Sequence, residues 1–346
     1  MTTAEDRRPV VVLTHRVYGE TLDLLGRQCR LRANQQEEGL AADELIRRTT
    51  SAEGLMVFMP DRIDAEFLDA CPELRIIAGA LAGYDNIDVD ACTRRGIWVS
   101  CVEDLLTDPT AELAVGLLIS LARNVLAGDQ RVRDDFRGWR PVLYGRTIVG
   151  STVGIIGAGA VGRTAARLLA GFDTRLVYYD PRPVPPPQAA ALQLERMTLD
   201  GLLGTSDAVI VCAPLLPATT HLLNRESLEA MRPGALLVNV GRGSVVDEAA
   251  VANALQSGHL GGYAADVFEF EDLSRPGRPD RVHPGLRDLP GRTLLTPHLG
   301  SAVATARRAI ENRAAQAILQ ALAGEVPDGA VNDPRRLSAP MTPPAI

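Results

Sequence analysis

The sequence has few cysteines, no long hydrophobic run and no excess of positive charge. Its five cysteines are irregularly spaced, without a C-x-x-C pair or a histidine at the spacing of metal ligands, so we expect reduced, mostly buried thiols and no metal site. The longest apolar stretch, Leu113 to Ala122, is about half as long as a membrane span and is flanked by Glu112 and Arg123. We therefore expect no membrane segment.

The 346-residue chain carries a formal net charge of −7. Such an excess of carboxylates argues against nucleic acid or an anionic membrane as a partner, but it leaves room for a local basic pocket that binds a small anion. The first residues pass from a charged segment directly into a short β-branched run and lack the hydrophobic segment of a signal peptide. We expect a cytoplasmic protein that acts on a small molecule.

Short apolar, β-rich runs alternate with helical patterns in two series, the second starting at Thr152. The predicted strands are residues 10–13, 55–59, 75–80, 97–99, 153–156, 175–179, 208–212, 235–240, 262–267 and 293–296. Strands that alternate with helices form parallel sheets covered on both faces. The length suits two domains of roughly 150 residues each. The sequence thus predicts an α/β protein of two doubly wound parallel-sheet domains, Rossmann- or flavodoxin-like, with an interdomain cleft.

A glycine-rich turn follows the first strand of the second series. Gly157, Gly159 and Gly162 form G-x-G-x-x-G between an apolar strand and an Ala/Leu-rich helix, and the next strand ends at Asp180. In this context the glycines allow a tight turn, close approach of a pyrophosphate and close helix packing. Asp180 would bind ribose hydroxyls and repel a 2′-phosphate. We predict NAD as the cofactor, although Arg182 could accept a 2′-phosphate.

Two helical patterns set the predicted domain boundaries. One, opened by Pro109, runs to about residue 133 and is expected to bridge the lobes; the other, residues 302–323, could return the chain to the first lobe. The stretch Pro183 to Pro187 is expected to be a rigid surface loop. We predict a discontinuous substrate-binding domain, made of residues 1–104 and 300–330. Residues 105–299 are predicted to form an NAD-binding Rossmann domain, and residues 331–346 a disordered tail.

Three polar residues each follow a predicted strand of the second domain: Arg242, Glu271 and His298. Ligand sites of open α/β sheets lie at this end of the strands. We predict that Arg242 binds and polarises an anionic or carbonyl substrate, that His298 exchanges the proton accompanying hydride transfer, and that Glu271 orients the imidazole. Asp266 is expected either to contact the nicotinamide carboxamide or to be a buried structural carboxylate.

The other four histidines have no clear acidic partner or motif in the sequence. We interpret them as structural or exposed: His15, His221, His259 and His283.

At this point several segments resemble a known family. GAGAVG, LLVNVGRGSVVDEAA, YAADVFEFED and TPHLGSA are similar to the D-2-hydroxyacid dehydrogenase family over nearly the whole chain, and Arg242, Glu271 and His298 match its catalytic residues. The resemblance is closer to the phosphite (phosphonate) dehydrogenase branch, through VFMPDRIDAEF, DLLTDPTAEL, FRGWRPVLYG and HLGSAV. It implies NAD-dependent hydride transfer from a small anion, phosphite. It also implies that the protein is a homodimer.

The resemblance also implies further site residues. Those expected to bind substrate are Met59, Ala82, Gly83, Trp139, Tyr144, Ser301 and Arg307. Those expected to bind the cofactor, besides the glycines and Asp180, are Thr110, Ala160, Val161, Pro214, Asp266 and Gly300.

One residue departs from that branch. Phosphite dehydrogenases carry a lysine immediately before the glycine of GALAGYDNIDV, where it is expected to contact the phosphite oxygens, and this sequence has Ala82. Three explanations remain open: another small anion as substrate, such as a 2-hydroxy acid or hydroxymethylphosphonate or its aldehyde; phosphite held by Arg242 and Arg307 alone; or an engineered alanine. A binding protein that senses NAD, like the corepressors of this fold family, is the alternative to an enzyme.

Overall fold

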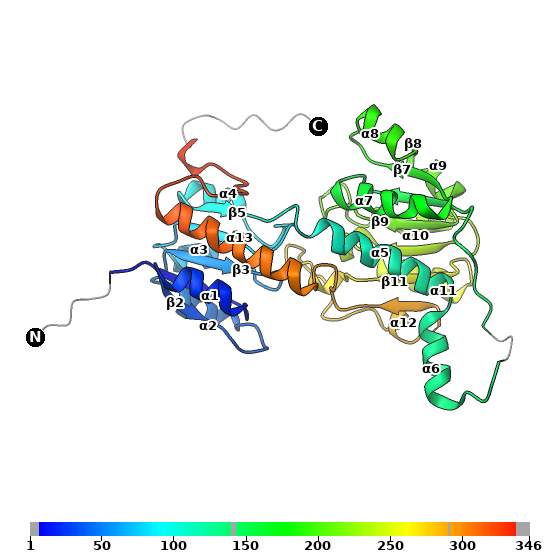
Figure 1. Cartoon of the computed structure of the whole chain (residues 1–346), viewed down its shortest axis with the longest axis horizontal. Helices are drawn as coiled ribbons and strands as arrows, with labels where there is room; N and C mark the ends of the chain where they lie inside the picture. Colours follow the sequence, from blue (N-terminus) through cyan, green and yellow to red (C-terminus); the bar gives the residue numbers. More distant parts are fainter. Residues whose placement is uncertain (1–6, 140–142, 290, 337–346) are drawn as a thin grey trace, which may run out of the picture. The chain divides into compact units, whose positions relative to one another are not determined.

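The computed structural model describes residues 7–139, 143–289 and 291–336. The chain forms two compact units, one containing the residues up to Leu106 and from Ala304 onward, the other Thr107–Val303 (Figure 1). The predicted boundaries, after residues 104 and 299, lie within a few residues of these. The fold class is as predicted, since each unit is a parallel sheet with helices on both faces.

The first unit has a five-stranded parallel sheet in the order β2-β1-β3-β4-β5. The strands are β1 (Val10–Leu13), β2 (Arg30–Ala33), β3 (Gly54–Val57), β4 (Ile76–Gly79) and β5 (Trp98–Ser100). The helices are α1 (Gly19–Gly26), α2 (Ala42–Thr49), α3 (Ala65–Ala70), α4 (Val89–Arg94), α13 (Ala304–Leu322) and η4 (Pro334–Arg336).

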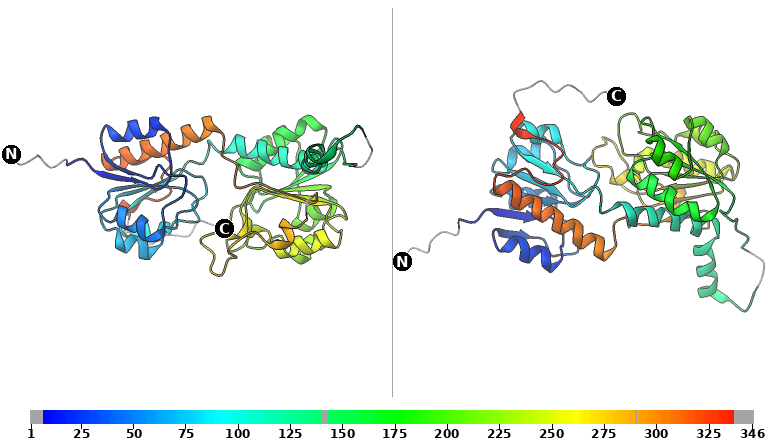
Figure 2. Two further views of the ribbon diagram at one scale, coloured as in Figure 1. Left: turned by 90° about the horizontal axis from the view of Figure 1, so that it is seen from below. Right: turned by 45° about the horizontal axis from the view of Figure 1, so that its top comes forward.

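Alternate strand side chains of this sheet are apolar on both faces, so each face carries its own helix layer. Val11 and Met56 pack in one core with residues of α1 and α13, whereas Val12 and Leu55 pack in another with residues of α2, α3 and α4. The two layers are visible on opposite sides of the sheet in Figure 2. The returning helix α13 completes a unit that the N-terminal residues alone would leave open on one face.

The second unit has a seven-stranded parallel sheet in the order β12-β11-β10-β9-β6-β7-β8. The strands are β6 (Thr152–Ile156), β7 (Arg175–Tyr179), β8 (Leu194–Arg196), β9 (Ala208–Val211), β10 (Leu236–Asn239), β11 (Gly262–Ala265) and β12 (Thr293–Leu295). The helices are α5 (Thr107–Ala122), α6 (Val125–Asp135), α7 (Ala160–Leu169), η1 (Ala170–Phe172), α8 (Pro186–Ala191), α9 (Leu199–Thr205), α10 (Arg225–Glu229), η2 (Gly243–Val245), α11 (Glu248–Gln256), η3 (Glu269–Glu271) and α12 (Pro284–Arg287).

Here too the strands are apolar on both faces. Ile155 and Val238 share a core with residues of α5 and α7, whereas Val209 and Leu237 share one with residues of α9, α10, α11 and α12. Adjacent parallel strands bring their carboxyl ends to one edge of the sheet, so the loops after β6, β9, β10, β11 and β12 lie along that edge.

All ten predicted strands overlap observed ones, but β2 and β8 were missed. Both are edge strands. An edge strand is exposed along one side, so it tolerates charged residues, and Arg30, Arg32, Glu195 and Arg196 obscure the apolar pattern.

Three further expectations were wrong. The helical pattern after Pro109 is not one helix but two, broken at Asn124 (φ 53), and both belong to the second unit. The stretch Pro183 to Pro187 is not only a loop, because Pro186 and Pro187 begin α8, where a missing N–H costs nothing.

The third concerns the tail from residue 331, whose first six residues are ordered. Val99 N–H donates to Asn332 Oδ1 at 2.8 Å, and the Arg335 guanidinium stacks 4.9 Å from the Trp98 ring centre. The remaining tail residues, 337–346, lie outside the described residues.

No single described helix has the length and apolarity to cross a membrane; α5 and α6 meet those limits only when taken together, across a bend of 60°.

Candidate active site

The glycine-rich turn sits where the strand order of the second unit reverses, between β6 and β9. Gly157 has φ +91, and a Cβ there would lie 2.7 Å from Ala213 N, in the chain that follows β9. A Cβ on Gly162 would lie 2.1 Å from Gly157 O, whereas nothing lies within 4 Å of a Cβ on Gly159. Two glycines therefore allow backbone packing, and the third leaves open space before α7.

That open space fits a pyrophosphate. Gly159 is the N-cap of α7 and has no side chain to satisfy the first N–H groups, and the N1 residue Ala160 is exposed. Val161 follows in the same turn, and exposed Pro214 lies in the loop after β9. The predicted pyrophosphate-binding residues thus lie together at the carboxyl edge of the sheet.

Asp180 follows β7 and anchors the glycine turn. Its Oδ2 accepts Ala158 N–H at 2.9 Å and its Oδ1 accepts Arg182 N–H at 2.9 Å. Each carboxylate oxygen has a second lone pair, so the group can still bind ribose hydroxyls. The fit to NAD is therefore good at both the phosphate and the ribose positions.

Arg242, Glu271 and His298 follow three adjacent strands, β10, β11 and β12, at the same sheet edge. His298 Nδ1 lies 2.6 Å from Glu271 Oε2, and the two side chains are 30% and 20% exposed. Phe268 N–H donates to Glu271 Oε1 at 2.9 Å, which fixes the carboxylate from the other side. The imidazole is thus held at Nδ1, which leaves Nε2 for proton exchange.

The loop that carries Arg242 is tied down by a buried amide. Asn239 Nδ2 donates to Arg242 O at 3.0 Å, and Asn239 Oδ1 accepts Gly241 N–H at 3.1 Å. Arg242 itself is half-buried and donates from Nη1 to Gly241 O at 3.0 Å. A planar guanidinium is suited by its several donors to bind a carboxylate or carbonyl oxygen.

His298 adopts a left-handed backbone conformation, φ 55, that Asp266 holds in place. The Asp266 carboxylate accepts Leu299 N–H at 2.7 Å and Gly300 N–H at 2.7 Å, and His298 N–H donates to Asp266 O at 2.9 Å. Thr296 Oγ1 donates to the same carboxylate at 2.6 Å. Asp266 is 2% exposed, so these contacts make it a buried structural carboxylate, and its contact with nicotinamide stays a prediction.

The structure also brings Thr110 to this loop. A Cβ on Gly300 would lie 3.1 Å from Thr110 Oγ1 and 3.3 Å from Asp266 Oδ2. Three of the predicted cofactor residues are therefore neighbours. Ser301, predicted to bind substrate, follows directly and is half-buried.

The predicted substrate residues of the first unit lie on two of its strand ends and on α13. Met59 follows β3, and the half-buried Ala82 and Gly83 follow β4. Arg307 Nη1 donates to Ala80 O at 3.1 Å, and its guanidinium lies 5.4 Å from the centre of the Phe58 ring. Burial lowers the pKa of Arg307, against the opposing effect of Glu311. Arg307 is therefore a largely desolvated cation beside the loop that carries Ala82.

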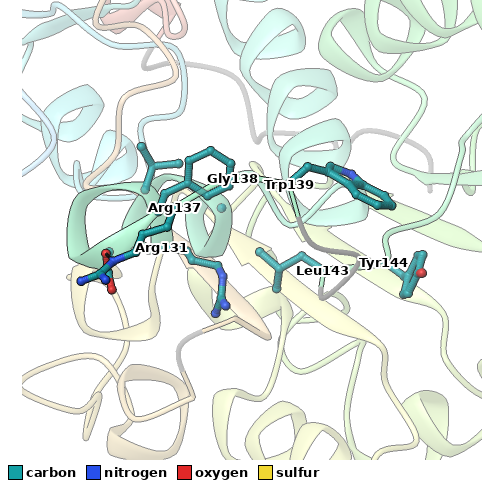
Figure 3. Close-up of a pocket in the computed structure, with 10 residues that line it drawn as sticks. Arg131, Arg137, Gly138, Trp139, Leu143 and Tyr144 are labelled. Atoms are coloured by element: carbon teal, nitrogen blue, oxygen red, sulfur yellow. Dashed lines mark hydrogen bonds and ion pairs between the residues drawn. The ribbon is translucent and has the colours of Figure 1, made fainter.

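Trp139 and Tyr144 lie elsewhere, on the segment after α6. They are 83% and 81% exposed. They line a hollow of about 510 Å³ beside α6 (Figure 3). Arg242, Glu271 and His298 are not among its lining residues, which are Gly128, Arg131, Val132, Asp135, Phe136, Arg137, Gly138, Trp139, Leu143 and Tyr144. In a single chain, therefore, both aromatic rings are surface groups, and their contact with substrate stays a prediction.

Two of the other histidines have acidic partners that the sequence did not show. His221 Nε2 lies 2.9 Å from Glu269 Oε2, and His15 Nε2 lies 3.5 Å from Asp61 Oδ1. Both carboxylates are far away in sequence, so no local motif shows the pairing. His259 Nε2 contacts Leu228 O at 3.0 Å and His283 Nδ1 accepts Gly285 N–H at 3.2 Å, which are structural roles.

The cysteines are free, four of them buried and Cys212 half-buried, as expected. Among residues 7–139, 143–289 and 291–336, no group of three or more His, Cys, Asp or Glu side chains is placed to hold a metal ion.

Comparison with known proteins agrees with this geometry. Residues 115–300 match the family of the D-isomer specific 2-hydroxyacid dehydrogenase, NAD binding domain. A glyoxylate reductase from Thermococcus onnurineus is 35% identical over 331 residues, 94% of this chain and 96% of the relative. A D-3-phosphoglycerate dehydrogenase from Mycobacterium bovis is 37% identical over 325 residues, 94% of this chain and 59% of the relative.

Among solved structures, the TT0316 protein from Thermus thermophilus superimposes with a TM-score of 0.84 at 35% identity, covering 93% of this chain and 100% of that one. The fold and the site together define an NAD-dependent oxidoreductase. More specifically, the chain belongs to the D-isomer specific 2-hydroxyacid dehydrogenase family.

Proposed function

We propose that this protein reduces a small 2-oxo acid of the glyoxylate class to the corresponding 2-hydroxy acid with NADH. The observation that carries the proposal is the 2.6 Å contact between His298 Nδ1 and Glu271 Oε2, with Arg242 at the end of the neighbouring strand. A proton donor and a cationic anchor are what carbonyl reduction of an anionic substrate requires. The glyoxylate reductase relative supports this substrate class.

Each residue has a separate task in this reaction. The glycine turn and Asp180 would hold NADH, which would supply a hydride to the oxo carbon when bound. His298 gives the proton from Nε2 to the carbonyl oxygen, so that the 2-oxo acid, one hydride and one proton become the 2-hydroxy acid. Glu271 holds Nδ1 and stabilises the imidazolium before the transfer. Arg242 binds the substrate carboxylate and polarises the carbonyl through its planar donors.

Phosphite oxidation is the second candidate, because several segments resemble phosphite dehydrogenases. Ala82 argues against it. The position lies in the loop after β4, where a lysine would offer a cation to the phosphite oxygens, and alanine offers only backbone N–H groups. Loss of a charge-assisted contact in a desolvated pocket costs about 2 to 5 kcal/mol. Backbone N–H groups of Ala82 and Gly83 suit a carboxylate better. The same argument applies to small phosphonates.

We expect a substrate panel to rank glyoxylate first. NADH absorbance is followed with glyoxylate in the reducing direction, and with phosphite, hydroxymethylphosphonate, glycerate and lactate in the oxidising direction. A higher kcat/KM for phosphite than for glyoxylate contradicts the proposal. Tight NADH binding without turnover of any compound supports the sensing protein instead.

We also propose a homodimer that covers a surface arm made of α6 and residues 136–139, 143 and 144. This arm concentrates large apolar side chains at its surface, each at least 43% exposed: Val125, Leu126, Val132, Phe136, Trp139, Leu143 and Tyr144. Apolar patches of this kind mark association surfaces. A second copy would remove the rings of Trp139 and Tyr144 from water.

The double variant Val132→Asp/Phe136→Asp is expected to be monomeric, with a mass of 37.0 kDa in light scattering after gel filtration, whereas the parent has twice that mass. Buried carboxylates without partners would destabilise the interface. Val149→Asp is the control, because Val149 is as exposed as Phe136, at 54%, but lies outside the arm. A monomeric parent protein contradicts the proposal.

A further inference from the structure

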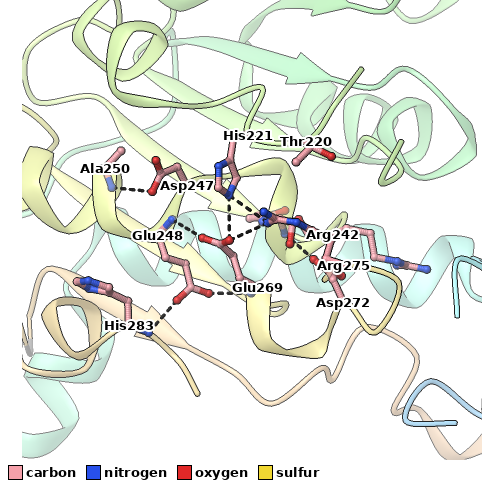
Figure 4. A network of polar contacts seen from close by, with 12 residues as sticks. Thr220, His221, Arg242, Asp247, Glu248, Ala250, Glu269, Asp272, Arg275 and His283 are labelled. Atoms are coloured by element: carbon pink, nitrogen blue, oxygen red, sulfur yellow. Dashed lines mark hydrogen bonds and ion pairs between the residues drawn. The ribbon is translucent and has the colours of Figure 1, made fainter. Parts of the chain in front are cut away.

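Loops at the carboxyl ends of β9, β10 and β11 are joined by a network of polar contacts (Figure 4). Glu248 begins α11 and Glu269 begins η3, and each accepts the backbone N–H of the other. Glu248 N–H donates to Glu269 Oε1 at 3.0 Å, and Glu269 N–H donates to Glu248 Oε1 at 2.9 Å. The residues Glu248 and Glu269 are 3% and 8% exposed, so the two hydrogen bonds that join their loops are shielded from water.

The second oxygen of Glu269 has two more donors. His221 Nε2 and Arg275 Nη1 each lie 2.9 Å from Glu269 Oε2. Arg275 Nη1 also lies 3.2 Å from His221 Nε2, so the imidazole and the guanidinium converge on one carboxylate oxygen. Figure 4 shows these side chains pointing at Glu269 from different loops. The Glu269 carboxylate is thus the point at which the three loops meet.

Backbone contacts between the same loops leave little freedom. His221 N–H donates to Ser244 O at 2.7 Å, and Ser244 N–H donates to Asp272 Oδ2 at 2.6 Å. A Cβ on Gly243 would lie 1.9 Å from Phe268 C, so the two backbones touch. Any shift of the turn that starts at Glu269 therefore moves it against the loop that follows Arg242.

Glu271 is the last residue of the same single turn, η3. Its Oε1 is held by Phe268 N–H within the turn and its Oε2 holds His298. The anchored Glu269 fixes one end of the turn, and Glu271 presents the proton-donating imidazole from the other end. The network thus connects a buried carboxylate to the reacting group through one turn of backbone.

We propose that Glu269 is a positioning residue for the reaction: its anchored carboxylate sets the place of Glu271, and so of His298, relative to Arg242. This inference rests on the proposed reduction of a 2-oxo acid. Taking a carboxylate and a guanidinium out of water is costly, and apolar residues of similar volume would often stabilise a fold as well or better. The need to fix Glu271 in the active site explains why the charged Glu269 and Arg275 occupy these positions.

The test is a double-mutant cycle between Glu269→Gln and Glu271→Gln, measured as NADH oxidation with glyoxylate. Glutamine keeps the volume but places an NH₂ group where a donor already points. In the parent background Glu269→Gln is expected to lower kcat by about 10- to 100-fold, since misplacement by about 1 Å costs up to about 10²-fold. KM for NADH should change less than about twofold, because the glycine turn is elsewhere.

In the Glu271→Gln background, Glu269→Gln is expected to lower kcat by less than about threefold, because its effect on the reaction passes through Glu271. Equal losses in both backgrounds would mean that Glu269 only stabilises the fold, and would overturn the inference. If Glu269→Gln fails to fold, Arg275→Ala gives the same cycle with a smaller loss. Its matched control is Arg278→Ala, an exposed position three residues along the same segment, which should retain parental kcat.

The two proposals fail differently. A parent enzyme that reduces glyoxylate while Glu269→Gln keeps full activity refutes the positioning role alone. A parent that reduces no member of the panel refutes the proposed function, and the positioning role falls with it.

Discussion

Replacing His298 with asparagine is expected to lower kcat for glyoxylate reduction by about 10²- to 10⁴-fold, the contribution of a positioned proton donor. Asparagine has no proton to give at the pH of the assay, so hydride transfer would leave an unprotonated alkoxide. It also tolerates the left-handed backbone at this position, φ 55, better than most residues. Steady-state kinetics measures the loss, and NADH fluorescence titration should show the affinity nearly unchanged.

His259→Asn is the matched control for that experiment, because the His259 imidazole contacts the Leu228 carbonyl and the residue lies after α11, outside the loops that carry Glu271 and His298. It should keep parental kcat. A His298→Asn variant with kcat within about threefold of the parent would refute the assignment of proton donor. A large fall in NADH affinity would show that the substitution disturbs the nicotinamide end of the site as well.

The second large effect is expected from Ala82→Lys, which would introduce the only lysine of the chain. Phosphite oxidation, slow in the parent, should rise at least about tenfold in kcat/KM, because the ammonium adds a charge-assisted hydrogen bond to an oxyanion. Ala82 is half-buried, so this position of the loop is partly open to solvent. NAD reduction with phosphite measures the gain, and glyoxylate reduction is followed in parallel.

Ala82→Met serves as the control of similar length without charge, and it should leave phosphite turnover at the parental level. Equal behaviour of the lysine and methionine variants would mean that the cation makes no contact with phosphite, and our explanation of Ala82 would be wrong. A parent enzyme that already turns over phosphite efficiently would show that the anion binds without a lysine at this position.

Much of this architecture could be predicted from local patterns. A central strand such as β9 is fully apolar because both faces of the sheet are covered, and G-x-G-x-x-G after β6 identifies the turn and its cofactor. The edge strands β2 and β8 escaped prediction for the converse reason. Solvent on one side lets Arg30 or Glu195 interrupt the apolar run. The ordered residues 331–336 escaped because Asn332 is held by the backbone of Val99, more than two hundred positions earlier.

The catalytic candidates could be predicted because each follows a strand, and the strand order then makes them neighbours. The network around Glu269 could not. His221 and Glu269 are 48 positions apart, and no recognisable motif contains both. The available signal was a glutamate at the start of each of two turns that follow adjacent strands, Glu248 and Glu269. Only the register of β10 against β11 shows that these turns meet.

The left-handed backbone of His298 has an energetic meaning. A non-glycine residue in this conformation is strained by about 1 to 3 kcal/mol, and the hydrogen bonds of Asp266 to the following N–H groups retain it. The imidazole is therefore aimed by the main chain before any substrate arrives, and little reorganisation remains for the moment of proton transfer. The fold is thus less stable by the energy of this strain, and in return the reacting nitrogen is preorganised for proton transfer.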